Sequence, residues 1–136
     1  MSIFLIYSEN KRCDNYEKKE IKMINVVSLI LFAIAALAGV TLAVMYTKGK
    51  LTIGGALLHG LFAASGLVVL IISAAQGQTT TIANYALVLF VIAALGGAVL
   101  FGSHLKKGML PKPLIGIHAA AAVIAFLMLL TGVFRK

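Results

Sequence analysis

Three long stretches without a single Asp, Glu, Lys or Arg take up most of the sequence, at residues 23–47, 51–105 and 113–134. A transmembrane helix needs about 20 mostly apolar residues to cross the hydrocarbon core of a bilayer. The first and last stretches each supply one span, and the middle stretch supplies two, divided by the polar turn at 76–81. The pattern predicts an all-α integral membrane fold, an up-down bundle of four helices at about 24–46, 53–75, 82–104 and 114–134.

The composition indicates that lipid is the solvent. Only 12% of the 136 residues are charged and the mean hydropathy is +1.03, whereas a soluble domain carries about 25% charged residues. The net charge of +8 comes from Lys and Arg in the N-terminal segment, in two loops and at the C-terminus, where cations anchor helix ends among lipid headgroups. This arrangement disfavours nucleic-acid binding and is typical of an integral protein of the bacterial inner (cytoplasmic) membrane.

Residues 1–22 differ from the transmembrane domain at 23–136, because they contain all four acidic residues of the chain. Three interpretations fit this polar tail. It is a mobile segment, a short interfacial helix, or an upstream extension of a protein whose translation begins at Met23. Cys13 is the only cysteine, so the chain cannot form an internal disulfide, and no Cys-x-x-Cys-His motif for covalent haem attachment is present.

An internal repeat links the two halves of the predicted bundle. Residues 31–39 match residues 89–97 at seven of nine positions, with an offset of 58. After a slip of one residue, His59 matches His118 at an offset of 59. The order of features agrees over a whole helical hairpin, which favours a duplicated hairpin whose copies are related by an axis along the membrane normal.

The spans contain no Asp, Glu, Lys or Arg, which leaves His59, His104 and His118 as candidates, and an intramembrane ionisable residue indicates a functional site. His59 and His118 lie about five or six residues into spans that run in the same direction, so both are roughly 8 Å below the same membrane face. These two spans are diagonal in an up-down bundle. Two imidazoles at equal depth on opposite walls are what the iron of a hexacoordinate haem requires.

Small residues near these histidines are expected to make room for a flat macrocycle. They are Ala56, Ala63 and Gly66 around His59, Ala121, Ala122 and Ala125 around His118, and Gly39 and Gly97 on the other two spans. The haem propionates need polar or positive partners, for which Lys48, Lys107 and His104 are candidates. His104 is alternatively a ligand of a second cofactor, although its repeat partner is Tyr46.

Other interpretations of the histidines stay open. A different metal or a quinone is one of them, although zinc is disfavoured because it takes four close ligands and the spans contain no Cys or carboxylate. A purely structural role is another, because intramembrane His residues form hydrogen bonds between helices and small residues promote close helix packing without any cofactor.

The pattern resembles small four-helix b-type membrane cytochromes, such as the cytochrome b561-like proteins and the haem-bearing membrane anchors of succinate dehydrogenase. The resemblance is one of architecture over residues 24–134 and rests on His59 and His118. It implies non-covalent haem b, one-electron transfer between a quinol pool and a redox partner, and a homo- or hetero-oligomer. Such a protein is an electron-transfer component of a membrane oxidoreductase. The alternative function is a non-catalytic scaffold or assembly subunit of a larger complex.

Overall fold

The fold consists of four α-helices in this computed structural model, which describes residues 2–106 and 111–134. They are α1 (Ser2–Thr47), α2 (Ile53–Ala75), α3 (Thr81–Leu105) and α4 (Lys112–Phe134), and no strand occurs in these two ranges. The all-helical prediction is confirmed. Four segments are long and apolar enough to cross a membrane: Met23–Thr47 of α1 and the whole of α2, α3 and α4. Their ends agree with the predicted spans to within two residues.

Short turns join α1 to α2 and α2 to α3. Gly49 and Gly77 have φ angles of 66° and 69°, a left-handed conformation that glycine adopts without steric cost and that ends α1 and α2 sharply. Thr52 and Thr80 follow as N-caps, and their hydroxyls accept hydrogen bonds from the amides of Gly55 and Ala83. Each cap contributes about 1 kcal/mol. The same turn chemistry therefore starts both α2 and α3.

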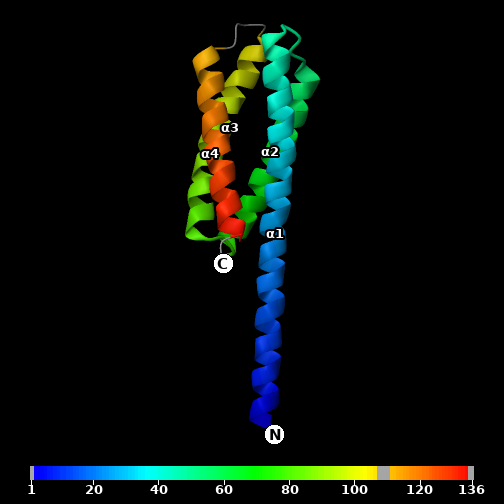
Figure 1. Ribbon diagram of the computed structural model, residues 1–136, viewed down its shortest axis with the longest axis vertical. Helices are drawn as coiled ribbons and strands as arrows, with labels where there is room; N and C mark the ends of the chain where they lie inside the picture. The colour runs from blue at the N-terminus through cyan, green and yellow to red at the C-terminus, as the bar shows by residue number, and fades with distance from the viewer. Residues whose placement is uncertain (1, 107–110, 135–136) are drawn as a thin grey trace.

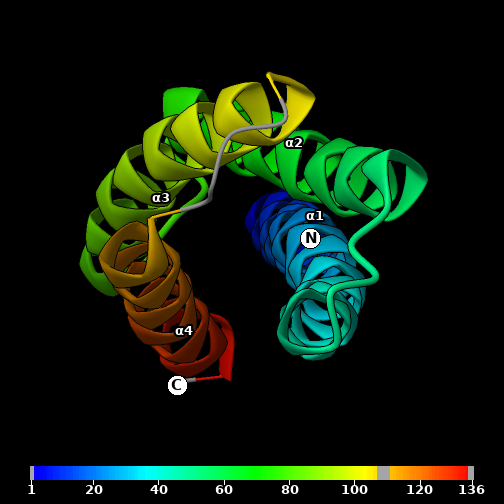
Figure 2. The ribbon, with the colours of Figure 1, turned by 90° about the horizontal axis from the view of Figure 1, so that it is seen from above.

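The four helices are arranged around a common axis in chain order (Figures 1 and 2). Most contacts lie within the hairpins, between α1 and α2 and between α3 and α4, and fewer join α2 to α3 and α1 to α4. The helix pairs α1 with α3 and α2 with α4 are diagonal and make no close backbone contacts in the described ranges. Side chains on α2 and α4 can therefore meet only across the interior.

Equivalent positions of the two hairpins are buried. In the first hairpin these positions are Asn25, Ser28, Phe32, Ala35, Gly66, Leu70 and Ser73. Offsets of 58 and 59 carry them to the buried residues Ala83, Ala86, Phe90, Ala93, Ala125, Leu129 and Gly132. The rings of Phe32 and Phe90 stack in parallel, with centroids 3.7 Å apart, where the hairpins meet. The sequence repeat therefore extends to the packing.

Polar contacts distinguish the first hairpin from the second. The Ser73 hydroxyl donates to Asn25 Oδ1 and Asn25 Nδ2 donates to the Gln78 carbonyl, both at 2.8 Å. The Ser28 hydroxyl donates to the Gly66 carbonyl at 3.0 Å. Ala83, Ala86 and Gly132 at the corresponding places cannot form such bonds. These hydrogen bonds fix α1 against α2 and the α2–α3 turn, and the equivalent positions of α3 and α4 have no counterpart to them.

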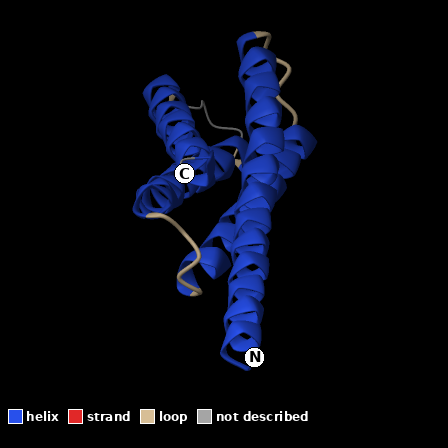
Figure 3. Ribbon diagram, turned by 60° about the horizontal axis from the view of Figure 1, so that its bottom comes forward, coloured by secondary structure: helices blue, strands red, loops and turns tan. Residues whose placement is uncertain are grey.

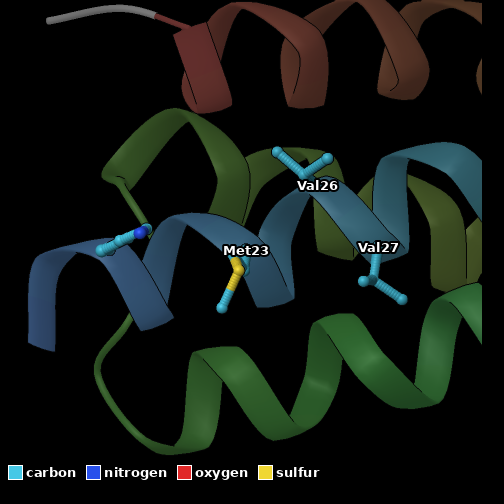
Figure 4. A pocket seen from close by; sticks show the side chains of 4 residues that line it. Met23, Val26 and Val27 are labelled. Atoms are coloured by element: carbon cyan, nitrogen blue, oxygen red, sulfur yellow. The ribbon is translucent and has the colours of Figure 1, made fainter. Parts of the chain in front are cut away.

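The N-terminal part of α1 continues as helix from Ser2 and extends beyond the bundle, as Figures 1 and 3 show. Among its described side chains, Tyr16 and Lys19 are exposed. A shallow hollow of about 430 Å³ lies where α1 leaves the bundle, lined by Lys19, Met23, Val26 and Val27 (Figure 4). Among the described side chains of α1, Asn25 is the first that is buried. The part of α1 before Asn25 therefore lies outside the packed interior of the bundle.

Removing residues 1–22 should leave the bundle intact. Because the described buried side chains start at Asn25, we expect the free energy of unfolding to change by less than about 0.5 kcal/mol, as for exposed substitutions. Thermal unfolding in detergent of a chain that begins at Met23 checks this. A large drop in the midpoint would show that the extension packs against the spans.

Equivalent core leucines should contribute equally to stability. Leu70 and Leu129 are both fully buried, so Leu70→Ala and Leu129→Ala should each lower the free energy of unfolding by about 2–5 kcal/mol. Leu61→Ala is the matched control, because Leu61 is 61% exposed and truncating it leaves no cavity. Reversible unfolding in mixed detergent micelles measures all three. Unequal losses at Leu70 and Leu129 would contradict the equivalence of the hairpins.

Candidate functional site: a histidine pair between α2 and α4

His59 of α2 and His118 of α4 meet in the interior of the bundle. Their ring centroids are 6.2 Å apart and the ring planes are inclined at 76°. Each histidine lies six residues after the first residue of its helix, which is about 9 Å along the helix axis. The two histidines therefore lie at equal depth along their helices, as the sequence predicts. Their side chains also form a pair, although α2 and α4 are diagonal in the bundle.

A backbone carbonyl orients each imidazole. His59 Nδ1 lies 2.8 Å from the carbonyl oxygen of Ala35 on α1, and His118 Nδ1 lies 2.8 Å from that of Ala93 on α3. A carbonyl oxygen only accepts hydrogen bonds, so Nδ1 carries the proton and donates in both cases. The lone pair of each neutral ring is then on Nε2. Among the residues that the structure describes, neither Nε2 has a hydrogen-bond partner.

Two glycines make room for the rings. A Cβ at Gly39 would lie 3.0 Å from His59 Cε1, and a Cβ at Gly97 would lie 3.1 Å from His118 Cε1. Both distances are shorter than ordinary van der Waals contact. The sequence suggested that these glycines open the walls for a macrocycle. The structure places both glycines directly against the imidazoles, where they allow each ring to reach its carbonyl partner.

The histidine pair lies at the boundary between a packed and an open half of the bundle. Within the described chain, the buried residues fall at 25–35, 66–73, 83–93 and 125–132. All of these are level with the histidines or lie toward the α2–α3 turn. No described residue between the histidines and the α1–α2 and α3–α4 loops is buried. Protein atoms therefore fill the interior on one side of the pair and leave it less filled on the other.

The other small residues expected near the histidines fall into two groups. The first group is half-buried and is not part of the packed half of the bundle. It consists of Ala56, Ala63, Ala121 and Ala122. Gly66 and Ala125 belong to the packed half instead. A Cβ at Gly66 would lie 3.3 Å from Leu31 and Phe32, and Ala125 is fully buried. Gly66 therefore lets α2 approach α1 closely, and Ala125 belongs to the buried core.

The candidate propionate contacts lie toward the open end. His104 is half-buried on the last turn of α3, and its Nε2 is buried without a hydrogen-bond partner in the structure as described. It follows Gly97 by seven residues, or two helical turns, so it lies on the same face of α3. Lys48 is exposed in the α1–α2 loop. Lys107 lies outside the described residues.

The ligand set itself limits the chemistry of the site. In the described part of the chain, no group of three or more His, Cys, Asp or Glu residues is placed to hold a metal ion. Two imidazoles alone do not make the closed tetrahedral site of structural zinc. Two imidazoles contributed by diagonal helices do suit a metal whose remaining ligands belong to an organic cofactor.

Comparisons with known proteins do not assign this site. No protein family matches the sequence, and neither a curated protein nor a solved structure matches the chain. The geometry of the histidines is therefore the basis on which a function is inferred.

Sequence reasoning missed the carbonyl partners. Ala35 and Ala93 carry no functional group in their side chains, and any residue offers a backbone carbonyl, so composition gives no signal. The repeat does contain one. Ala35 and Ala93 are separated by 58 residues, and each precedes a glycine, Gly39 or Gly97, by four residues. Because the glycine has no side chain, an imidazole can reach the alanine carbonyl one helical turn before it.

Proposed function

We propose that this protein is a four-helix b-type cytochrome that holds one haem between His59 and His118. The observation that carries the proposal is the pair of imidazoles with both Nδ1 atoms bonded to carbonyls and both Nε2 atoms left for a ligand. Metal–imidazole bonds are about 2.0 Å long, so two rings on opposite sides of one ion have centroids roughly 6 Å apart. The separation of 6.2 Å fits that arrangement.

The surrounding chain would perform the supporting roles that a metal-ligating histidine requires. An imidazole that binds a metal through one nitrogen usually donates its other N–H to a carbonyl or carboxylate, which fixes the tautomer and the ring orientation. The carbonyls of Ala35 and Ala93 do this for His59 and His118. Haem b would supply reversible one-electron chemistry, and the apolar bundle around it would set its potential through low polarity and restricted access to water.

The membrane setting supports this function. The bundle presents large apolar side chains on its outer surface, including Leu37, Leu57, Leu61 and Leu95, which lipid would cover. We infer an up-down bundle that arose from a duplicated hairpin and spans the bacterial inner membrane. The polar N-terminal extension and the two lysine-bearing loops would then lie on opposite sides. An electron carried by the haem would pass between a quinol pool or a partner subunit and this site.

A visible spectrum of the purified protein tests the proposal. Axial ligands control the electronic state of haem iron, so the reduced protein should show the sharp α-band of low-spin haem b, with one haem per chain. The pyridine haemochrome assay gives the ratio of haem to protein. Full-length protein from haem-replete membranes that shows no such band would refute the cytochrome assignment.

A scaffold or assembly subunit is the second candidate, and outward-facing glycines favour it. Gly54, Gly60, Gly102 and Gly116 have no heavy atom within 4 Å of the place that a Cβ would occupy. Small residues on outer helix faces allow partner helices to approach closely in lipid. The double variant His59→Leu/His118→Leu separates the two functions. A scaffold keeps its fold and its partner, whereas a cytochrome loses its chromophore.

His104 should bind a propionate rather than iron. We expect His104→Ala to retain the low-spin spectrum and one haem per chain while shifting the reduction potential, because a hydrogen-bonding group near the propionates changes the local field. Redox titration and the haem-to-protein ratio check both points. If His104→Ala halves the ratio, the chain binds two haems. If it abolishes binding while His118→Ala does not, the ligand assignment is wrong.

A further inference from the structure

Exposed lysines surround the open end of the bundle. Lys48 and Lys50 lie in the α1–α2 loop, Lys106 follows α3 and Lys112 begins α4, and all four are exposed. The α1–α2 loop, the end of α3 and the start of α4 lie at the same end of the molecule (Figure 1). We refer to these four lysines as the lysine rim.

Opposite charges are absent from this end. The four acidic residues of the chain are Glu9, Asp14, Glu17 and Glu20. They belong to the part of α1 that extends past the other end of the bundle (Figure 1). No acidic side chain neutralises the rim within the chain, so the rim attracts anionic surfaces at a range of about 8 Å at physiological ionic strength.

The histidine pair is closer to the rim than to the opposite end. His59 and His118 lie about 9 Å along their helices from the rim, and no described residue between them and the rim is buried. Toward the opposite end, the stacked Phe32 and Phe90 and the buried Leu70 and Leu129 fill the interior. A redox group held by the histidines would therefore exchange electrons with a soluble molecule most directly through the rim.

We propose that the lysine rim is the docking surface for the acidic face of a soluble electron-transfer protein. This inference rests on the proposed function for the choice of a redox partner, whereas the docking itself depends only on charge. The lysines come from both hairpins and from two separate connections between helices, so positive charge is present on both halves of this end of the bundle. Charge on both halves complements the acidic face of a protein, which steers the two surfaces together.

Binding of fluorescein-labelled decaglutamate to the full-length protein in phosphatidylcholine nanodiscs tests this docking surface. We expect decaglutamate to bind and decalysine not to bind, and the affinity for decaglutamate to fall at least tenfold between 50 and 500 mM NaCl, as screening of surface charges requires. The variant K48Q/K50Q/K106Q/K112Q should lower the affinity at least tenfold. The control K11Q/K18Q/K19Q/K22Q removes four lysines from the opposite end and should leave it unchanged.

Three results would overturn the docking proposal. An equal loss of affinity in the control variant and the rim variant would mean that net charge alone binds the peptide. Free glutamate at an equal concentration of residues could compete fully, which would indicate a small-anion site. Nanodiscs with 20% phosphatidylglycerol could abolish binding, which would assign the rim to lipid headgroups. The variant His59→Ala/His118→Ala should still bind decaglutamate, so a missing haem spectrum and a missing docking surface are separate failures.

Discussion

Replacing either His59 or His118 by Ala should convert a low-spin haem spectrum to a high-spin one and reduce haem retention sharply. Each substitution removes one of two axial ligands, so the loss of haem affinity should exceed the 10–100-fold that typically follows loss of an outer-shell partner. The two variants should behave alike, because the rings have equivalent carbonyl partners at the same distance. Absorption spectra and haem-to-protein ratios of purified His59→Ala and His118→Ala measure both effects.

Added imidazole distinguishes loss of a ligand from loss of the fold. Removal of the ring leaves space at its former position, so millimolar imidazole should restore part of the low-spin spectrum in either variant. His104→Ala is the control, and its spectrum should not respond. A His118→Ala protein that retains full low-spin haem without imidazole would show that His118 is not an axial ligand.

Adding one methyl group at Gly39 or Gly97 should impair haem binding nearly as much as removing an orienting hydrogen bond. The new Cβ would lie 3.0 Å from His59 Cε1 or 3.1 Å from His118 Cε1, so the ring must move away from its carbonyl by a few tenths of an ångström. Loss of this outer-shell contact predicts a 10–100-fold fall in haem affinity. Competition with apomyoglobin for haem measures the affinities of Gly39→Ala and Gly97→Ala.

Glycines of α2 and α3 that face open space provide controls. Gly60 follows His59 directly and Gly102 lies on α3 with Gly97, and neither has an atom within 4 Å of the added Cβ. Because Ala is favoured over Gly in a helix by about 1 kcal/mol, Gly60→Ala and Gly102→Ala should raise stability and leave haem affinity unchanged. If all four variants behave alike, the glycines have no specific role beside the imidazoles.

Hydrophobic length determined the helices from the sequence alone. A lipid-spanning segment must satisfy its backbone hydrogen bonds internally and reach across the hydrocarbon core, so the apolar runs and the polar turn at 76–81 define the number of spans and their ends. They do not define the start of α1, which continues as helix from Ser2 ahead of its apolar span at Met23. The predicted spans match the apolar segments of α1 to α4 to within two residues. The repeat also placed His59 and His118 at equal depth, because equal offsets in two parallel helices give equal rises along the axis.

The rotation of each helix about its axis was decided only by the tertiary structure. Helices that are apolar on all sides have no polar face to indicate which residues point inward, so the sequence could not distinguish the positions that flank a site from those that pack the core. For this reason Gly66 and Ala125 were expected beside the histidines but lie in the packed half. For the same reason, only the packing of α2 on α1 and of α4 on α3 reveals that each imidazole bonds to a backbone carbonyl. The glycine four residues after that carbonyl has no side chain to block the ring.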